Sequence, residues 1–574
     1  MKLSESALEI AENRYFMTER NEDWETCTLR VGRVVANAEN SKAMEHAEKF
    51  SEIIYDMYFL PGGRIFRNAG RPRGSMFNCY HLPIGDSREE IGQYYKDSLI
   101  LWGEGGGIGV NISSLRPSGA PIKGVGGTSS GPVSFLEASD AIAETIESGG
   151  SRRAAALASM NVAHPDILRF IDAKLVHGKL SHFNISVAVT EDFLEAVESK
   201  RDWEFKFANK TYGKMPAIEI WDKIVENMVN CAEPGLLNWD NVIKNNSYYY
   251  DPVMGTNPCG EAVLAPYDVC DLGSLVLPKF ITGNINTNWK KLEDVIKLAV
   301  RFLDDVIDIN KYVLQEIDIK AHNSRRIGLG VMGLAEYLFA KKVRYGSEKS
   351  IVEIERLMKF IRDKVYETLI ELSIEKGSFP RFDPVAYGKA SFIRKLPASL
   401  RMSIKEHGVR CVTGMALAPT GTISLLAGAT SGVEPLFRKA YRRSDRVSDR
   451  IYVHSIYKDL LCMEGEIPDW YVDADDLEPY EHFEVQAAVQ KYTDGAVSKT
   501  INMPVGTKPS TLSKLTLEYI YDLKGVTVYV DECREGQILN KISRKDVEEY
   551  LKKCNVDSKV DVETTKCPSG SCEL

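Results

Sequence analysis

The chain has 574 residues, which is long for a single hydrophobic core and predicts several structural units. Its 44% hydrophobic and 27% charged residues are typical of globular proteins outside membranes. A formal net charge of −9 gives no general reason to expect a nucleic-acid partner, and no apolar run is long enough to cross a membrane. No signal peptide is evident, and an odd count of eleven cysteines argues against a fully disulfide-paired secreted protein. We therefore expect a cytoplasmic protein whose thiols are mostly reduced.

The N-terminal residues predict helices. Ser6 followed by Glu9 has the spacing of a capping box, with apolar residues at helical spacing after it. A second apolar-periodic segment runs over 43–57, and Pro61 with the two glycines after it ends that helix. This region forms a helical preface to the rest of the chain.

Glycine is concentrated in three stretches, 103–109, 124–131 and 149–153. Glycine lets a backbone approach a phosphate closely, and Arg116, Lys123 and Arg152 lie in or near these stretches to supply positive charge. The alternative is a set of flexible linkers. The strand-like run at 108–112 favours nucleotide-binding loops, although the glycines do not form a GxGxxG turn with a following acidic residue.

Short apolar strands then alternate with long helices. Strands are predicted over 184–189 and 526–529, and an amphipathic helix over 289–308. A long helix is predicted over 350–376, with Ser350 and Glu353 at its start and Gly377 at its end. This alternation predicts an α/β fold with a largely parallel sheet.

The stretch 257–261 places a thiol, Cys259, between the amide of Asn257 and the carboxyl of Glu261. In an extended loop, alternate side chains project to the same side, so all three could meet one ligand. The alternative is a buried cysteine in a loop capped by polar residues. A thiol beside an amide and a potential base indicates a reaction centre.

The chain ends in a polar segment with Cys567 and Cys572 separated by four residues. Such a pair is typical of a mobile dithiol. A zinc site would need a second pair of ligands, and only Cys554 lies near. A redox function is therefore favoured.

Several of these motifs, in order along nearly the whole chain, resemble the catalytic chains of ribonucleotide reductases. They are the stretch 257–261, the run after Cys270, the run 419–424 and the terminal cysteine pair. The resemblance implies an α/β fold, a ten-stranded barrel of two parallel five-stranded halves with a central finger loop. It also implies a helical N-terminal region over 1–78, a catalytic barrel over 79–535 and a flexible redox tail over 536–574.

The resemblance also implies roles for individual residues. Cys259 would become a thiyl radical that removes the 3′-hydrogen of a ribonucleotide, Glu261 would act as a base at the 3′-hydroxyl, and Asn257 would hold the sugar. Cys79 and Cys270 would supply two electrons and form a disulfide.

Further positions match the family's reductant, substrate and effector sites. Cys567 and Cys572 would reduce the active-site disulfide and be reduced in turn by a thioredoxin- or glutaredoxin-like protein. The substrate, a diphosphate by resemblance to dimeric members, would contact Asn78, Gly107, Thr420, Gly421, Thr422, Ile423 and Ser424. For 420–424 the alternative is an ordinary capped turn. Effectors (dNTPs or ATP) would contact Asp86, Ser87, Arg116, Lys123 and Arg152, and a homodimer is expected.

The branch of the family follows from how its radical is generated. A separate radical subunit needs two adjacent tyrosines, but Tyr529 is followed by Val530. The tail has no glycyl-radical motif, so adenosylcobalamin is the predicted cofactor, without a histidine ligand to cobalt. The alternatives are the catalytic subunit of a two-subunit reductase and a nucleotide-binding regulator without catalysis. The remaining cysteines have no assigned role, and most are expected to be packing residues: Cys27, Cys231, Cys411, Cys462, Cys533 and Cys554.

Overall fold

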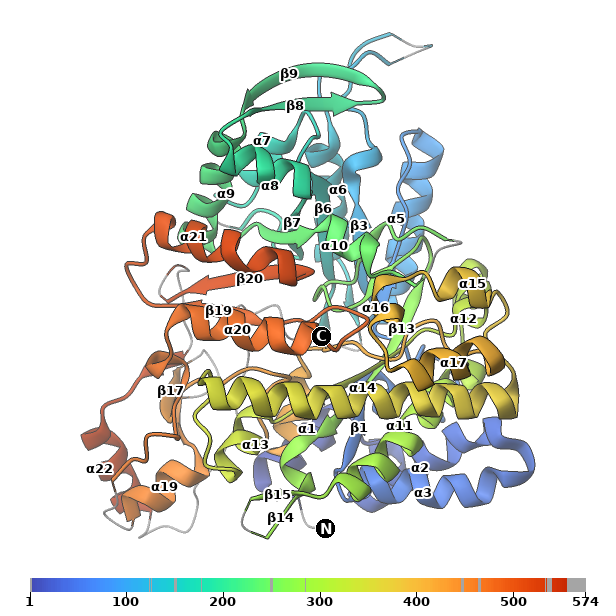
Figure 1. Cartoon of the computed structure of the whole chain (residues 1–574), viewed down its shortest axis with the longest axis vertical. Coiled ribbons are helices and arrows are strands. Elements are labelled where there is room, and N and C mark those ends of the chain that lie inside the picture. Colours follow the sequence, from blue (N-terminus) through green and yellow to red (C-terminus); the bar gives the residue numbers. More distant parts are fainter. Residues whose placement is uncertain are drawn as a thin grey trace.

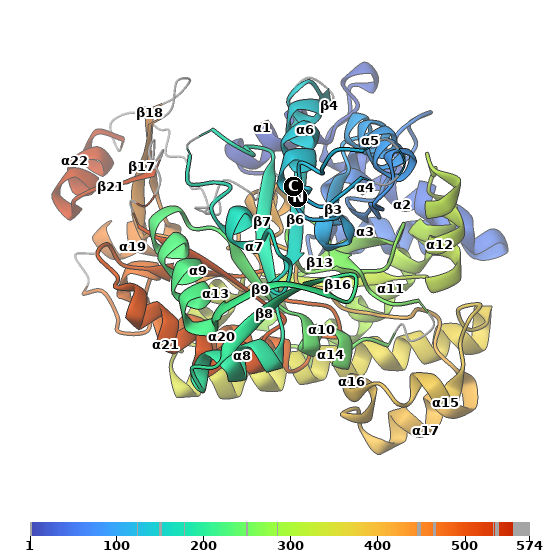
Figure 2. The same cartoon turned by 90° about the horizontal axis from the view of Figure 1, so that it is seen from above.

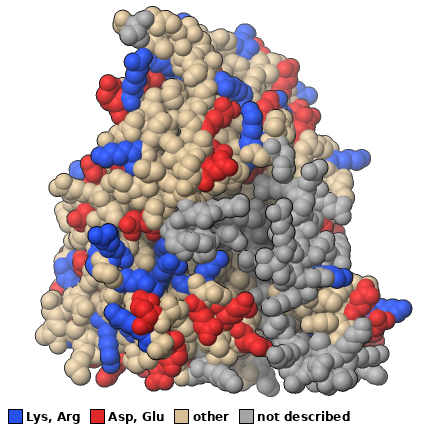
Figure 3. Space-filling model, turned by 180° about the vertical axis from the view of Figure 1, so that it is seen from behind, with Lys and Arg blue, Asp and Glu red and all other residues tan. Residues whose placement is uncertain are grey.

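The computed structural model describes residues 3–122, 124, 126–148, 152–176, 178–247, 251–283, 285–444, 449–462, 466–531, 533 and 539–554. Within these ranges, no helix is both long enough and apolar enough to span a membrane. On the face shown in Figure 3, basic and acidic side chains are interspersed among the described residues.

The N-terminal region is helical, as predicted. It consists of α1 (Glu5–Arg14), α2 (Trp24–Ala36), α3 (Ala43–Tyr55) and α4 (Gly63–Asn68), of which α2 and α3 pack against each other and against α11 (Trp289–Ile309). The predicted capping by Ser6 is wrong by two residues, because the Ser4 hydroxyl accepts the bond from the Ala7 amide at 3.2 Å. In contrast with α2 and α3, α1 packs against α18 (Gly421–Ala427), which lies far from it in the sequence.

Five parallel strands form the first half of a barrel. Their order is β2, β3, β6, β7 and β10, and each pairs in parallel with the next. Their bounds are β2 (Cys79–His81), β3 (Gly107–Asn111), β6 (Ala155–Asn161), β7 (Phe183–Val189) and β10 (Gly235–Asn238). Nearly all their side chains are buried, because helices cover the outer face while other strands and a loop fill the inside. These helices include α5 (Arg88–Gly103), α6 (Pro132–Glu144) and α9 (Ala217–Cys231).

The second half is also parallel. Here β13 (Val269–Val276) pairs with β16 (Ile327–Met332), and β19 (Thr500–Met503) pairs with β20 (Gly525–Val530). Isolated parallel bridges join Leu329 to Met415 and Leu417 to Val497, so the segment 415–417 runs between β16 and the residues leading into β19. The half therefore also contains five parallel segments.

The two halves join into a closed barrel through two antiparallel contacts. At one seam β10 pairs with β20, and at the other β2 pairs with β13. The additional strand β1 (Phe59–Pro61) lies antiparallel to β13 beyond β2. Figure 2 shows β6, β7, β13 and β16 at the centre with helices around them. The predicted barrel of two parallel five-stranded halves is confirmed.

Long helices pack around the second half. The apolar side chains of α11 recur at helical spacing and are buried, as predicted, while α14 (Glu348–Lys376) crosses the molecule in Figure 1 and contacts α11 and α20 (Pro479–Gln490). The C-terminal end of α14 at Gly377 agrees with the prediction. Its start does not, because the hydroxyl of Ser347 caps the helix by accepting from the Ser350 amide.

A small lobe lies at one side of the barrel in Figure 2. Its sheet pairs β17 (Ala440–Ser444) with both β18 (Asp449–Val453) and β21 (Leu539–Lys541). The helix α22 (Arg544–Cys554) buries Val547 and Leu551 in a cluster with Tyr457 and Tyr471. The predicted tail, 536–574, therefore begins with a paired strand and a packed helix.

Asp494 holds the segment 413–417 in the barrel, where this segment is joined to its neighbours only by isolated bridges. Its buried carboxylate accepts bonds from the backbone amides of Gly414 and Met415, both at 2.8 Å, and from the Tyr366 hydroxyl at 2.8 Å. These contacts complement the isolated bridges, which provide few ladder hydrogen bonds there.

We expect Asp494→Ala to lower the free energy of unfolding by on the order of 3 kcal/mol, since each buried donor left unsatisfied costs roughly 1–3 kcal/mol. The measurement is the urea unfolding curve. The matched control is Asp192→Ala, whose carboxylate is 71% exposed beside Arg201 and should change stability by less than about 1 kcal/mol. Equal effects of the two substitutions would contradict the assigned role.

Candidate active site

A finger loop carries the predicted reaction centre into the barrel. Its two sides, β11 (Gly255–Thr256) and β12 (Val263–Leu264), pair in antiparallel fashion, and residues 257–262 form the tip. At the tip, the Asn257 side-chain oxygen accepts from the Ala262 amide at 3.0 Å, and the Asn257 carbonyl accepts from the Gly260 amide at 3.1 Å. Gly260 has φ +79°, a left-handed conformation that glycine adopts without strain. The tip is therefore a turn and not the extended loop that we expected.

Both halves of the barrel hold the finger. A side chain at Gly109 on β3 would overlap the Thr256 carbonyl, since a Cβ there would lie 1.5 Å from that oxygen. On the opposite side, the Ala496 amide donates to the Glu261 carbonyl at 2.8 Å. Asn184 on β7 contacts the Pro258 carbonyl at 3.5 Å. The loop is thus fixed at its base and on both sides of its tip.

The turn brings Asn257 and Glu261 together at a cysteine from another strand. The Asn257 amide donates to the Cys79 sulfur at 3.1 Å, and the Cys79 thiol donates to a Glu261 carboxylate oxygen at 3.7 Å. All three side chains are buried. The second Glu261 oxygen, Oε2, and the side-chain oxygen of Asn78 have no hydrogen-bond partner among the described residues. Buried oxygens without a partner mark a position where a ligand can bind.

Burial also sets the protonation states. It raises the pKa of Glu261 to about 7, and hydrogen bonds from Asn257 and Cys79 oppose this shift only in part. Burial, followed by the nearby Glu261 charge, raises the pKa of the Cys79 thiol. Burial and Asp271 likewise raise the pKa of Cys270. Both thiols are therefore protonated at neutral pH, and Glu261 is close to half-ionised.

Cys79 and Cys270 face each other across the seam between the two halves. They are directly opposite in the antiparallel pairing of β2 with β13, and neither is in a disulfide. Opposite residues in such a pair have Cα atoms about 4.5–5.5 Å apart, within the range of a disulfide. Both lie in one buried cluster with Ala262 and Ala416. The structure therefore brings together the two cysteines predicted as a redox pair.

Cys259 borders two cavities. One, of about 40 Å³, is lined by Asn78, Cys79, Glu261 and residues of the 418–423 segment. The other, of about 80 Å³, is lined by residues of β6, β7, β10 and β20 and shares Cys259 and Pro419 with the first. The thiol at the tip of the finger therefore borders two cavities whose linings otherwise differ.

The predicted phosphate-binding run forms the start of α18. Thr420 precedes this helix with φ +58°, and its hydroxyl accepts from the Gly432 amide at 2.9 Å. Ser424 is buried, and its hydroxyl contacts that of Ser431 at 3.0 Å. Thr420, Thr422 and Ile423 line the smaller cavity, whereas Gly421 and Ser424 do not. Gly107 pairs with Cys79 on the neighbouring strand and does not line it either.

Two of the predicted effector residues form an ion pair. Asp86 accepts from the Arg116 backbone amide and guanidinium, both at 2.9 Å, while the neighbouring Ser87 caps α5 by accepting from the Glu90 amide. Arg152 lies in the short strand β5 (Arg152–Arg153), opposite β4 (Glu147–Ser148), and only its backbone is described. Lys123 and both tail cysteines, Cys567 and Cys572, lie outside the described residues.

Sequence reasoning missed three residues that shape the site. Asn184 contacts the fingertip, Gly109 makes room for it, and the hydroxyl of Tyr15 contacts that of Thr422 at 2.5 Å. Gly109 lies in the glycine-rich run, which was interpreted as a nucleotide-binding loop. Asn184 and Tyr15 lie in an ordinary strand and at a helix end, where no local signal marks them.

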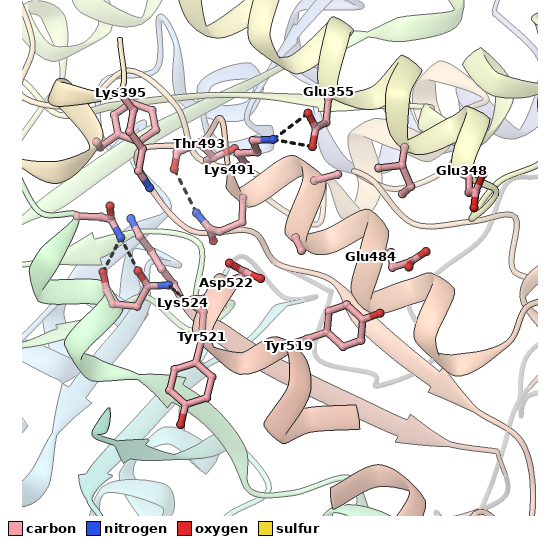
Figure 4. A pocket seen from close by; sticks show the side chains of 17 residues that line it. Glu348, Glu355, Lys395, Glu484, Lys491, Thr493, Tyr519, Tyr521, Asp522 and Lys524 are labelled. Carbon is pink, nitrogen blue, oxygen red and sulfur yellow. Dashed lines mark hydrogen bonds and ion pairs between the residues drawn. The ribbon is translucent and has the colours of Figure 1, made fainter. Parts of the chain in front are cut away.

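A separate cavity of about 560 Å³ lies among α14, α20 and the residues that precede β20 (Figure 4). Its charged side chains make internal contacts: Lys491 pairs with Glu355 at 2.9 Å, and Lys524 donates to the carbonyls of Asp494 and Gly495. No cysteine lines it. It shares no lining residue with the two cavities beside Cys259, where the redox-capable groups lie.

Comparison with known proteins agrees with this geometry. Residues 77–530 match the family model described as "Ribonucleotide reductase, barrel domain", and residues 1–74 match "Ribonucleotide reductase, all-alpha domain". The chain belongs to the ribonucleotide reductase family. The resemblance identified from the sequence is therefore confirmed.

Individual relatives are similar over most of the chain. A "Vitamin B12-dependent ribonucleoside-diphosphate reductase" of Mycobacterium tuberculosis is 35% identical, over 95% of this chain and 82% of the relative. A protein of the same name from Thermoplasma acidophilum is 32% identical, over 93% of this chain and 72% of the relative. A "Ribonucleoside-diphosphate reductase subunit alpha" of Chlamydia trachomatis is 25% identical, over 79% of this chain and 49% of the relative.

The opposed cysteines lead to a prediction about oxidation. We expect mild oxidation of the purified chain to join Cys79 and Cys270, because directly opposed cysteines need little backbone movement to form a disulfide. Peptide mapping by mass spectrometry would detect the link, and Cys79→Ser and Cys270→Ser should each abolish it. Cys411→Ser, at another buried thiol, is the control and should leave the link in place. Failure of the 79–270 link to form in the unaltered chain would contradict the geometry.

Proposed function

We propose that this chain reduces ribonucleotides to 2′-deoxyribonucleotides through a radical on the Cys259 sulfur. The observation that carries the proposal is that this thiol lines two cavities. One of them also contains Cys79 and Glu261, and Cys270 lies opposite Cys79. Replacing a 2′-hydroxyl by hydrogen requires a hydrogen-atom acceptor, a base and two reducing equivalents, and this arrangement supplies all of them.

The reaction begins at the 3′-carbon, because loss of its hydrogen atom makes the neighbouring carbon–oxygen bond labile. Cys259, as a thiyl radical, takes this hydrogen atom and becomes a thiol. Glu261 accepts the proton of the 3′-hydroxyl, and its pKa of about 7 suits a base that works near neutral pH. Asn257, already bonded to Cys79, orients the sugar.

Cys79 and Cys270 complete the reduction. One thiol protonates the departing 2′-hydroxyl, which leaves as water, and the other gives its hydrogen to the 2′-carbon, so the pair gives up two electrons and becomes a disulfide. Glu261 then returns its proton to the 3′-oxygen and Cys259 its hydrogen atom to the 3′-carbon, so the radical returns to sulfur. The raised pKa values of Cys79 and Cys270 fit this role, because the step needs protonated thiols.

The names of the B12-dependent relatives support a cobalamin cofactor, and we propose adenosylcobalamin. When bound, it supplies a carbon radical through homolysis of its cobalt–carbon bond. Such a group would lie over the mouth of the second cavity, whose lining beside Cys259 includes the small residues Ala232, Gly235, Gly260 and Gly525. The sequence has no Asp-x-His-x-x-Gly motif, so we propose that no histidine of the chain binds this group.

The alternative, a catalytic subunit that receives its radical from a second protein, has less support. Tyr529 on β20 is followed by Val530, which has no oxidisable group for a radical relay. The non-catalytic regulator is also disfavoured, because the candidate cysteines, base and amide meet in one cavity.

We assign the substrate, effector and reductant to the residues that the family resemblance indicates. The diphosphate would bind at 420–424, where hydroxyls and helix-end amides can receive an anion. Asn78 and Gly107 would contact the substrate. An effector dNTP or ATP would bind at Asp86, Ser87, Arg116, Lys123 and Arg152 in a homodimer. Cys567 and Cys572 would reduce the active-site disulfide and receive electrons from a thioredoxin- or glutaredoxin-like protein.

We further propose the division into a helical region over 1–78 and a catalytic barrel over 79–535. The redox segment that carries Cys567 and Cys572 follows α22, because β21 and α22 pack in the small lobe.

The purified single chain should reduce a ribonucleoside diphosphate when supplied with adenosylcobalamin and a dithiol, with no second protein. The measurement is deoxynucleotide formed over time. Cys259→Ser should abolish turnover, because serine cannot form a comparable radical, while nucleotide binding stays within about twofold. Cys411→Ser is the matched control and should keep activity. Turnover that needs a second protein would favour the two-subunit alternative.

We expect kcat/KM to rise with pH through about 7. The raised pKa of Glu261 means that the ionised base forms only as the pH passes that value. Single-turnover measurements on pre-reduced protein would exclude effects of pH on the external dithiol. A rate that falls over this range would argue against Glu261 as the base.

A further inference from the structure

A tyrosine of the N-terminal helical region contacts the phosphate end of the active site. Tyr15 lies at the C-terminal end of α1, which packs against α18. Its hydroxyl oxygen lies 2.5 Å from that of Thr422, and Thr422 lines the cavity beside Cys259. Tyr15 is only 3% exposed, so its contact with Thr422 is shielded from solvent.

Two contacts hold this tyrosine in place. Its ring packs on Phe66 with centroids 5.1 Å apart, and its carbonyl accepts from the Arg30 guanidinium at 3.3 Å. Gly63 leaves room for the ring, since a Cβ at this position would lie 3.3 Å from the ring and 3.8 Å from the Thr422 hydroxyl oxygen. The tyrosine hydroxyl is thus aimed at Thr422 by packing.

The direction of the hydrogen bond between Tyr15 and Thr422 decides whether Thr422 can donate to an anion in the cavity. A threonine hydroxyl has one proton, so it can donate to a phosphate only when that proton is not used elsewhere. If Tyr15 donates to Thr422, the Thr422 proton is left for the cavity. None of the described residues that line this cavity is Lys or Arg, so an anion there depends on hydroxyl and amide donors.

We propose that Tyr15 is a positioning residue for substrate phosphate: it donates to Thr422 and thereby orients the Thr422 hydroxyl as a donor to the nucleotide's phosphate group. This inference rests on the proposed function. It makes the N-terminal helical region part of the substrate site. It also assigns to that region a contribution to affinity for the phosphorylated substrate, separate from the radical chemistry.

A double-mutant cycle on the full chain tests the assignment, with Tyr15→Phe, Thr422→Val and the double variant. The readouts are the Kd of a ribonucleoside diphosphate, and KM and kcat with adenosylcobalamin and dithiol. Tyr15→Phe should raise Kd and KM about three- to tenfold, the contribution of one neutral hydrogen bond, with kcat changed less than about twofold. The double variant should bind like Thr422→Val alone, because Tyr15 acts through Thr422.

Two comparisons separate positioning from general packing. The unphosphorylated ribonucleoside should bind Tyr15→Phe and the unaltered chain equally. The control variant is Tyr387→Phe, which removes a different buried tyrosine hydroxyl, one that donates to the Val412 carbonyl, and it should leave the diphosphate Kd unchanged. Additive effects in the cycle, an equal loss for the nucleoside, or an unchanged diphosphate Kd in Tyr15→Phe would each overturn the inference. Lack of turnover by the unaltered chain would instead count against the proposed function, while the binding cycle still tests Tyr15.

Discussion

The fixed position of the finger loop inside the closed barrel is the constraint on which the rest of the site depends. The strands of the loop pair with each other, and its tip is held by Asn257 within the turn and by the bond from the Ala496 amide to the Glu261 carbonyl. The absence of a side chain at Gly109 allows the loop backbone to approach β3. Because both halves contribute, the tip has a defined position only once the barrel is closed. The active site is therefore complete only in the closed barrel.

Enclosure of the tip also selects the chemistry. In water a thiol and a carboxylate would have ordinary pKa values, and a cysteine beside a base would suit nucleophilic catalysis. Here burial favours neutral forms, so Cys79 and Cys270 stay protonated and the Glu261 carboxylate becomes a stronger base than an ordinary one. These states fit hydrogen-atom and proton transfer better than thiolate attack.

The helical N-terminal region belongs to this arrangement more closely than its sequence indicates. Helices α2 and α3 pack against each other and against α11, but α1 reaches α18, and the Tyr15 hydroxyl at its end contacts Thr422, which lines the cavity beside Cys259. At the other end of the chain, β21 and α22 complete a small sheet and helix lobe. Segments distant in sequence thus border or extend the catalytic barrel.

The sequence by itself determined the α/β class, several of the helices and strands, and the residue types of the reaction centre. These features are local: the apolar period of α11, the strand at 184–189 and the spacing of 257–261 are all set by neighbours in the chain. Helix starts at Ser4 and Ser347 were misplaced by two and three residues, because several nearby hydroxyls could cap equally well. Only the tertiary structure decided which cysteines oppose each other, that the fingertip is a turn, and that Tyr15 contacts Thr422 across 407 residues. Those contacts depend on strand register and barrel closure, which arise from packing among distant segments, and no local sequence pattern specifies them.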